Sequence, residues 1–216
     1  MKEETSPIPV SQQLLDIAQE YKKMMFFYEA GIEMMLARLQ ILNKQYRMNS
    51  DRNPIESIQH RIKSMQSIQD KMNRKGISIT LENIMTNLYD IAGVRVICSF
   101  KDDVYKIASF LMRQDDIMLI KMKDYIENPK PNGYRSLHLI LTIDVCFEER
   151  KAQVPIELQL RTIAMDFWAS LEHQLRYKKN FALVENADRD LKTCADIMAD
   201  ADERMQRLAT EVLKEK

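Results

Sequence analysis

The chain contains 216 residues, of which 45% are hydrophobic, so it is long and apolar enough to bury a core of its own. Its 32 basic and 32 acidic residues cancel to a formal net charge of zero, which leaves no overall field to attract DNA. The N-terminal segment lacks the apolar centre of a signal peptide, and no apolar run approaches the length of a membrane span; we expect a cytoplasmic protein without a membrane partner.

The three cysteines, Cys98, Cys146 and Cys194, are far apart in the sequence, and each lies among apolar residues. An odd number of widely spaced cysteines argues against a disulfide framework and against a zinc site. The pattern predicts three buried thiols in a reducing compartment.

An amphipathic helix is predicted at each end of the chain. In residues 12–47 apolar residues recur at spacings of three and four, and Gly31 is expected to break or kink this helix. A second helix is predicted over residues 188–213, with an apolar face formed by Leu191, Cys194, Met198, Ala201, Met205, Leu208 and Val212. We expect residues 1–52 to form an N-terminal arm and helix. Residues 181–216 are expected to form a C-terminal helix that contacts other copies of the chain.

Residues 53–76 are also predicted to form a helix. Asn53 and Pro54 suit its cap and first turn, and Gly76 suits its end. Several cations lie off its apolar stripe, namely Arg61, Lys63, Lys71, Arg74 and Lys75. They form either a solvated basic face or a cradle for phosphate groups. The chain contains neither GxGxxG nor GxxxxGK[ST], so a phosphate cradle would have to consist of side chains.

Asp90 precedes a strand that is predicted from about Val94 to Phe100. An acidic residue at the edge of a strand is either a turn residue or, together with a second carboxylate, a ligand for Mg²⁺. Arg95 lies between Val94 and Val96 and therefore points to the opposite face of the strand. A planar guanidinium there could stack on a purine.

A basic loop connects two further predicted strands. A helix over residues 102–114 and a short strand over residues 117–122 lead into it, and Lys121, Lys123 and Lys130 surround it. Such a loop is commonly only solvated. This one ends at Gly133 and runs into Tyr134, and an aromatic ring beside cations suits a nucleobase and its phosphates.

Residues 136–161 predict a hairpin whose second strand alternates strictly between apolar and polar residues. Ile156, Leu158 and Leu160 share one face, and Glu157, Gln159 and Arg161 share the other. The polar face is either solvated or the floor of a cleft, and His138 on the first strand also points away from its apolar neighbours.

Thr162 is expected to cap a helix with Ile163, Phe167, Leu171 and Leu175 facing inward, and with Asp166 and His173 facing the cleft. The elements together predict an α+β fold with a mixed sheet of about five strands, packed with helices and extended by a helix at each end.

Five segments carry a specific resemblance, in this order: HRIKSMQSIQDKMNRKG (60–76), DIAGVRV (90–96), KDYIENPKPNGYRSLH (123–138), IELQLRT (156–162) and MDFWASLEH (165–173). Together they resemble the synthetase domain of the RelA/SpoT family, which makes the alarmones ppGpp and pppGpp. The resemblance implies a fold similar to that of nucleotidyltransferases. The resemblance covers roughly residues 54–178, so we expect the catalytic core in residues 53–180.

The resemblance implies transfer of the β,γ-pyrophosphate of ATP to the 3′-hydroxyl of GTP or GDP, with release of AMP and with Mg²⁺ as the cofactor. It places the metal on Asp90 and Glu157, and Glu157 would also orient or deprotonate the hydroxyl. Gln159 and Arg161 would support Glu157. The residues that it places on ATP are Arg61 and Arg95 at the adenine and Lys63, Lys71 and Arg74 at the phosphates.

The resemblance also implies an acceptor site. Guanine would stack on Tyr134, and the phosphates would meet Lys123, Lys130 and His138, joined by Arg135. Two residues depart from close relatives. Lys123 replaces an arginine, which turns a two-pronged phosphate contact into a point charge. Asp166 stands where some small members of the family carry an asparagine, and its carboxylate could accept from the guanine N1 and N2 donors.

Residues 1–53 leave no room for a preceding hydrolase region, so the resemblance implies a small member of the family that synthesises without hydrolysing and forms a homotetramer. Two other functions fit the residues. A non-catalytic guanine-nucleotide or RNA-binding sensor would not need both Asp90 and Glu157. A helical interaction protein would leave Tyr134, Glu157 and the basic loop without a reason to coincide. The preferred acceptor and any regulatory ligand are left open.

Overall fold

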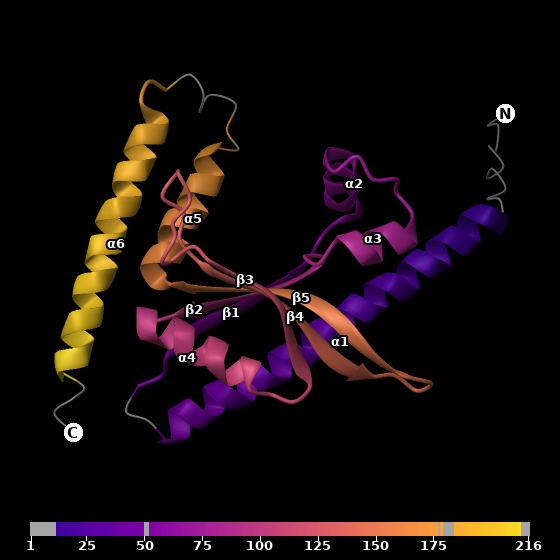
Figure 1. Cartoon of the computed structure of the whole chain (residues 1–216), viewed down its shortest axis with the longest axis horizontal. Coiled ribbons are helices and arrows are strands. Elements are labelled where there is room, and N and C mark those ends of the chain that lie inside the picture. The colour runs from indigo at the N-terminus through magenta and orange to yellow at the C-terminus, as the bar shows by residue number, and fades with distance from the viewer. Residues whose placement is uncertain (1–11, 50–51, 177, 179–183, 213–216) are drawn as a thin grey trace, which may run out of the picture.

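The structure, a computed structural model, describes residues 12–49, 52–176, 178 and 184–212. Residues 1–11 of the predicted N-terminal arm and helix, and the end of the predicted last helix at Leu213, lie outside these ranges. Within them the chain forms five strands and six α-helices, whose arrangement can be followed in Figure 1. The helices are α1 (Gln12–Asn49), α2 (Met65–Arg74), α3 (Leu81–Asn87), α4 (Lys101–Met112), α5 (Ile163–Arg176) and α6 (Ala187–Val212). The strands are β1 (Ile55–Ile62), β2 (Ala92–Cys98), β3 (Ile117–Asp124), β4 (Leu137–Cys146) and β5 (Lys151–Thr162).

The five strands form one mixed sheet in the order β1-β2-β5-β4-β3. Only β2 and β5 run parallel, and the other three pairs are antiparallel. Pro155 lies opposite Thr142 of β4, but the pairing of β5 with β2 begins only at Glu157, so at Pro155 the strand is still unpaired on its β2 side, as is common for a proline in a sheet. The expected α+β fold with a five-stranded mixed sheet is confirmed.

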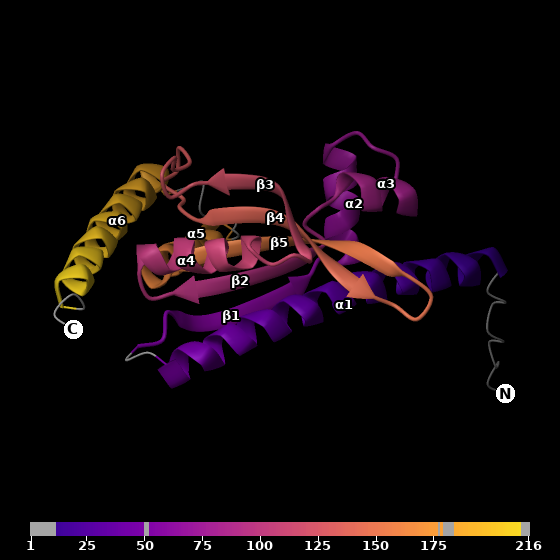
Figure 2. The same cartoon turned by 60° about the horizontal axis from the view of Figure 1, so that its bottom comes forward.

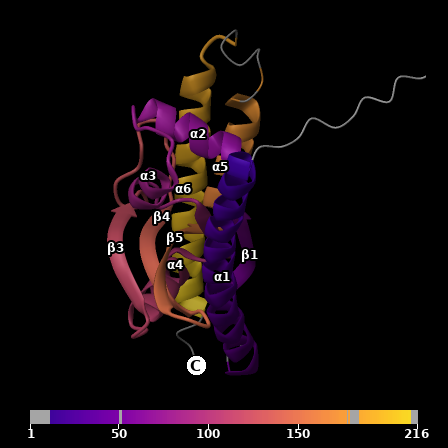
Figure 3. The ribbon, with the colours of Figure 1, turned by 90° about the vertical axis from the view of Figure 1, so that its right-hand side faces the viewer.

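One face of the sheet is buried and the other is polar. Ile156, Leu158 and Leu160 are fully buried in the hydrophobic core, together with Val94 and Val96 on β2. Below the sheet in Figure 1, α1 and α4 cover this apolar face, and Figures 2 and 3 show α1 running lengthwise along the sheet. The helices α2, α3 and α5 lie on the opposite side, so the polar face is bounded by helices at its two ends.

The segment after Pro54 is a strand, which corrects the helix predicted over residues 53–76. Ile55–Ile62 pairs with β2 as an antiparallel edge strand, and the side chain of Asn53 accepts from the amide of Ile55 instead of capping a helix. The isoleucines of this segment are β-branched, which favours a strand once a partner ladder is available. A helix begins only at Met65, where the Ser64 side chain accepts from Ser67 N, and Gly76 ends it with a φ of +66° as expected.

The inward face predicted for the helix after Thr162 is wrong, and the apolar face predicted for the last helix is mostly exposed. On α5 the side chains that pack inward are Met165, Trp168 and Ala169, whereas Ile163, Phe167, Leu171 and Leu175 are between 41% and 55% exposed. On α6 the buried residues are Ala195 and Asp202, and of the predicted apolar face Leu191 and Met198 are partly buried against Trp168 and Ala195. The predicted apolar stripe of each helix therefore faces largely outward, because these helices pack mainly on each other and not on the sheet. The cap by Thr162 is confirmed, since its hydroxyl accepts from the amide of Met165.

Gly31 does not break α1, which is continuous past it. A Cβ at Gly31 would lie 2.5 Å from Cγ1 of Val154, so the missing side chain lets the helix approach β5 closely. Cys98 is buried as expected, but Cys146 and Cys194 are exposed because one ends β4 and the other faces outward on α6. No helix in the described part of the chain has the length and apolar content needed to cross a bilayer.

Candidate active site

A row of polar side chains crosses the open face of the sheet from edge to edge. Strand register aligns Gln59, Arg95, Gln159, His138 and Lys123, one from each strand. Paired residues on neighbouring strands point to the same face of a sheet. The row therefore brings together four residues that the sequence proposed as binding or supporting residues, and it adds Gln59, which no sequence signal singled out.

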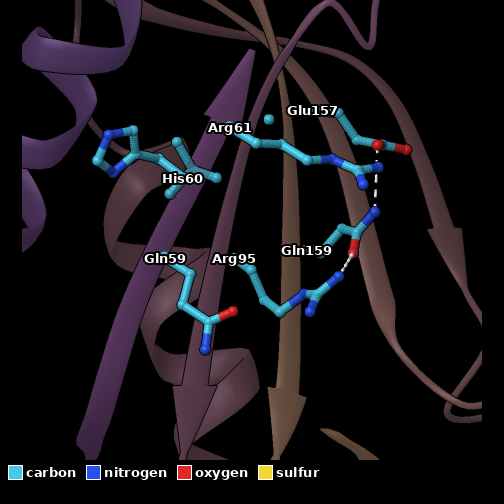
Figure 4. A pocket seen from close by; sticks show the side chains of 8 residues that line it. Gln59, His60, Arg61, Arg95, Glu157 and Gln159 are labelled. Atoms are coloured by element: carbon cyan, nitrogen blue, oxygen red, sulfur yellow. Dashed lines mark hydrogen bonds between the residues drawn. The ribbon is translucent and has the colours of Figure 1, made fainter. Parts of the chain in front are cut away.

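The neighbouring row contains the floor of a cavity. Register aligns Arg61, Gly93 and Glu157 on β1, β2 and β5. Because Gly93 has no side chain, the space above it is open: a cavity of about 150 Å³ lies there, shown in Figure 4. Arg61 extends over this gap, with its Cγ only 3.6 Å from where a Gly93 Cβ would be.

Arg161 connects β5 by hydrogen bonds to α5 and to the loop between β3 and β4. It is only 4% exposed, and its guanidinium donates to Asp166 Oδ1 at 2.9 Å, to the Tyr134 hydroxyl at 2.8 Å and to Gln159 Oε1 at 3.2 Å. Arg95 donates at 3.4 Å to the same oxygens of Asp166 and Gln159. Asp166 is thus already bonded to two arginines, and Arg161 orders the residues around Glu157.

Tyr134 lies in an aromatic and cationic cluster at the same end of the cleft. Its hydroxyl is 2.8 Å from His138 Nε2, and the ammonium of Lys130 lies 4.7 Å from its ring centroid. The same ammonium lies 4.8 Å from the ring of Tyr125, which packs edge-on against Tyr134 and His138. Sequence reasoning missed Tyr125, although it stands in the same basic loop and an aromatic residue there was a usable signal.

Asp90 lies at the other end of the cleft, before β2. Its Oδ2 accepts from Lys63 Nζ and from Lys71 Nζ, both at 2.5 Å. Burial alone would raise the pKa of Asp90, but the two hydrogen bonds and the two ammonium charges outweigh it, so the pKa lies below its ordinary value. The second oxygen, Oδ1, is buried without a hydrogen-bond partner in the described structure. Nearby, burial and the charge of Asp90 raise the pKa of Tyr28 to about 12.

Glu157 is also held as a carboxylate. Burial raises its pKa, but hydrogen bonding and charge from His138, whose Nδ1 lies 3.4 Å from Oε1, outweigh this effect, and the net pKa lies below its ordinary value. Gln159 Nε2 donates to Oε2 at 3.1 Å. The negative charge of Asp90 raises the pKa of Glu157, so the two carboxylates lie close enough to interact electrostatically.

These two carboxylates fit a divalent cation that is completed by substrate. A free oxygen on Asp90 and an ionised Glu157 supply the oxygen ligands that Mg²⁺ prefers. Among the described residues no group of three or more His, Cys, Asp or Glu side chains could hold a metal without other ligands. Mg²⁺ commonly takes one or two carboxylates together with phosphate oxygens, so this donor set suits a metal–nucleotide complex.

The remaining proposed residues lie around this centre. Arg74 lines a hollow of about 440 Å³ together with Arg61 and Lys63, and its Nε donates to the carbonyl of Asp70. Lys123 is exposed on the edge strand. Arg135 points away from the cleft and toward α6, where it contacts Ala195 and Asp196.

Comparisons with known proteins agree with this geometry. The family model described as "Region found in RelA / SpoT proteins" matches residues 60–182. The GTP pyrophosphokinase YwaC of Bacillus subtilis is 41% identical over 92% of this chain and 95% of its own length.

Two solved structures of the small alarmone synthetase 1 from Bacillus subtilis are similar as well. The one bound to its product pppGpp has a TM-score of 0.81 and 32% identity, and it covers 90% of this chain and 98% of that chain. The one bound to AMPCPP has a TM-score of 0.76 and 30% identity, over 91% of this chain and 99% of that chain.

Proposed function

The chain belongs to the RelA/SpoT family, and from this we infer that it is a (p)ppGpp synthetase. It transfers the β,γ-pyrophosphate of ATP to the 3′-hydroxyl of GTP or GDP and releases AMP, the reaction that produces the alarmones of the stringent response. Similarity to a GTP pyrophosphokinase over nearly the whole chain supports this function. The observation that carries it is one cleft in which Asp90, just before β2, and Glu157, on the neighbouring parallel strand β5, lie between a group of cations and an aromatic cluster.

The two ends of the cleft suit the two nucleotides. At the end formed by β1 and α2, we assign the adenine of ATP to Arg61 and Arg95, and its phosphates to Lys63, Lys71 and Arg74. Lys63 and Lys71 now neutralise Asp90, so both ammonium groups are already concentrated where phosphates would arrive. A solved relative bound to AMPCPP supports an ATP site in this fold.

At the other end, we assign the guanine to Tyr134, whose ring lies within reach of Lys130 and Arg161. Lys123, Lys130 and His138 are assigned to the acceptor phosphates, and Asp166 to the guanine edge. The relative bound to pppGpp supports a guanosine site. Whether GDP or GTP is the better acceptor depends on the phosphate contacts, which these positions leave open.

Glu157 is suited to orient the attacking hydroxyl and to receive its proton. In the reaction the 3′-oxygen forms a bond to the β-phosphorus, the bond from this phosphorus to the oxygen bridging the α- and β-phosphates breaks, and AMP leaves with that oxygen. A carboxylate with a lowered pKa is a strong hydrogen-bond acceptor at neutral pH but a weak base, so orientation is the larger contribution. Asp90 and Glu157 would hold Mg²⁺, which would supply positive charge against the phosphates.

Several further properties are part of the proposal. We propose residues 53–180 as the catalytic core, residues 1–52 as its N-terminal helical extension and residues 181–216 as an oligomer contact within a homotetramer. A cytoplasmic location follows from the proposed substrates, ATP and guanosine nucleotides. Synthesis without hydrolysis is tested by incubation of pppGpp with the protein, which should leave the nucleotide intact.

The direct test is label transfer. The protein is incubated with Mg²⁺, ATP labelled at the γ-phosphate and GDP or GTP, and the nucleotides are then separated. Label in a guanosine tetra- or pentaphosphate, with AMP released in equal amount, is the expected result. Nucleotide binding without any transfer would contradict it and would instead indicate a sensor that uses the same cleft.

A further inference from the structure

The loop that carries Tyr134 packs against α6 so closely that its backbone leaves no room for a side chain at Gly133. We call residues 125–136, which connect β3 to β4, the acceptor loop. Gly133 in this loop has a φ of +89°, and a Cβ placed on it would lie 2.5 Å from Cβ of Ala195 and 3.1 Å from Cδ of Lys192. No side chain fits between the loop backbone and the helix. Figures 1 and 2 both show the loop beside α6.

Arg135 holds the loop to the same helix from the other side of Tyr134. Its guanidinium donates to the carbonyl of Gly133 at 3.1 Å, to the carbonyl of Ala195 at 3.4 Å and to the carboxylate of Asp196 at 3.4 Å. Arg135 thereby bonds the loop backbone and the helix with a single rigid group. Ala195 is buried under these contacts.

The helix itself is fixed to α5 and to the end of β5. Trp168 on α5 donates its indole N–H to the carbonyl of Leu191 at 2.8 Å, and the hydroxyl of Thr162 donates to Asp202 at 2.5 Å. Trp168, Ala169 and Ala195 form a small hydrophobic cluster of their own, against which Tyr134 packs. The acceptor loop, α5 and α6 therefore form one packed unit.

We propose that α6 is a positioning element of the acceptor site, in addition to any role between subunits. The residues directly before and after Tyr134 are both held by α6, while the ring between them faces His138 and Arg161. Docking of α6 thus fixes the loop in the conformation in which the ring can stack on guanine. A site that is ordered before binding loses less conformational entropy when the ligand arrives. This inference rests on the assignment of Tyr134 to the guanosine nucleotide in the proposed function.

The test displaces α6 at its contact with Gly133. Ala195→Leu places a larger side chain against Gly133, where the backbone of the loop already leaves no room for a Cβ, and Thr193→Leu places a leucine at an exposed position of the same helix that lies off its apolar face. Binding of GDP is measured by calorimetry in the presence of AMPCPP, and the KM values for acceptor and ATP are measured separately. Ala195→Leu should raise the dissociation constant and KM of the acceptor about tenfold and leave those of ATP within about twofold, because only the acceptor loop loses its support. Thr193→Leu should change neither the acceptor values nor the ATP values.

Trp168 reports whether the helix has moved. It is the only tryptophan of the chain, and its indole bonds α6, so its emission should shift to longer wavelength in Ala195→Leu. A shifted emission with unchanged acceptor affinity would overturn the proposal, and so would an equal loss for ATP and acceptor.

A milder variant avoids the risk that Ala195→Leu disrupts the fold. Asp196→Lys places a cation beside Arg135, and Asp200→Lys is the matched exposed control. We expect a loss of acceptor affinity of about threefold that diminishes at high salt, because an exposed pair is screened. Equal affinities in the two variants would overturn the role of Arg135. The binding measurements need no turnover, so absence of pyrophosphate transfer in the unmodified protein refutes the proposed function without deciding this question.

Discussion

Glu157 shares a row with Arg61 and Gly93 and contacts two residues of the neighbouring row, and a single substitution can remove its charge while keeping its size. Its carboxylate is kept ionised by His138 and accepts a hydrogen bond from Gln159. Glu157→Gln keeps the size and one accepting oxygen but removes the charge. We expect the rate of transfer to fall by about 10³-fold or more while ATP binding stays within a few-fold, since charge and orientation act on the transition state. Single-turnover transfer and ATP calorimetry measure the two effects.

The matched control for this variant is Glu56→Gln on the exposed side of β1. It should transfer pyrophosphate at the rate of the unmodified protein. Normal turnover in Glu157→Gln would remove Glu157 from the role proposed for it.

Tyr134 contributes a ring and a hydroxyl, and two substitutions separate them. Tyr134→Ala removes both and should raise the acceptor KM about tenfold or more, because stacking of one base is worth roughly 1–3 kcal/mol. Tyr134→Phe keeps the ring but loses the hydroxyl that contacts His138 and Arg161. If stacking dominates, the phenylalanine variant should stay within a few-fold of the unmodified protein, whereas equal losses would assign the effect to the hydroxyl network. Acceptor KM at saturating ATP is the measurement.

At the scale of single residues, period-two alternation predicted which side chains of β5 face the cleft. It placed Glu157, Gln159 and Arg161 on one face, and the structure places them there. The pairing of Lys63 and Lys71 with Asp90 could not be predicted, because it depends on how α2 is placed relative to the end of β2. Gln59 entered the site only through its register with Arg95, which a single sequence does not encode.

At the scale of elements, Gly31 tests how α1 approaches the sheet. Gly31→Ala should gain about 1 kcal/mol in helix propensity, but its Cβ would lie 2.5 Å from Cγ1 of fully buried Val154. The clash should dominate and lower the free energy of unfolding by about 1–3 kcal/mol. Urea denaturation measures this change.

A double-mutant cycle identifies the clash as the cause. Val154→Ala removes Cγ1, although its Cβ stays 2.8 Å from the new methyl group, so the relief should be partial. The double variant should lose less stability than the sum of the two single variants. Strict additivity, or a Gly31→Ala variant more stable than the unmodified protein, would refute the close approach.

The buried carboxyl group of Asp202 on α6 makes the stability of the folded protein depend on pH. Burial raises its pKa above the ordinary value, and the hydrogen bond from Thr162 offsets this only in part. A carboxyl with a raised pKa in the folded state binds its proton more tightly there than in the unfolded chain. It therefore favours folding at low pH, and this contribution is lost as the pH rises through the raised pKa. At pH 7 the buried charge is a cost to stability.

Asp202→Asn removes that charge and keeps an oxygen for Thr162. We expect its Tm at pH 7 to be a few degrees higher, since about 1 kcal/mol shifts Tm by roughly 2–4 °C in a chain of this size. The difference should shrink as the pH is lowered and Asp202 in the unmodified protein becomes protonated. Calorimetric scans at several pH values measure it, and a difference that grows toward acid pH would contradict the assignment.

The errors in the predicted elements have a common physical origin. The segment Ile55–Ile62 has apolar residues at helical spacing, yet an available edge on β2 made it a strand. On α5 the apolar stripe through Phe167 and Leu171 would suit a core, yet the helix buries Trp168 against α6. In both cases tertiary partners decided between patterns that local spacing allows. Residues 92–98 and 137–162 were predicted well because their buried runs and alternation leave one strand arrangement.

At the scale of the whole molecule, the exposed apolar stripe of α6 suits the interface that we propose between copies of the chain. Met205 and Leu208 are each 54% exposed and Val212 is 70% exposed, although Ala195 and Asp202 on the same helix are buried. A stripe of this kind on one face of a long helix is costly to leave in water. We expect a mass of four chains in light scattering coupled to size-exclusion chromatography, as the proposed homotetramer requires.

The combined substitution of Met205→Glu and Leu208→Glu should reduce this mass, because each carboxylate would be buried without a partner in the interface. Ile79→Glu, at an exposed apolar position between α2 and α3, is the control and should leave the mass unchanged. Since α6 also supports the acceptor loop, loss of the assembly should raise the acceptor KM more than the ATP KM. A protein that is monomeric before substitution would refute the interface, and a dissociated variant with unaltered acceptor KM would show that α6 supports the loop without help from a neighbouring chain.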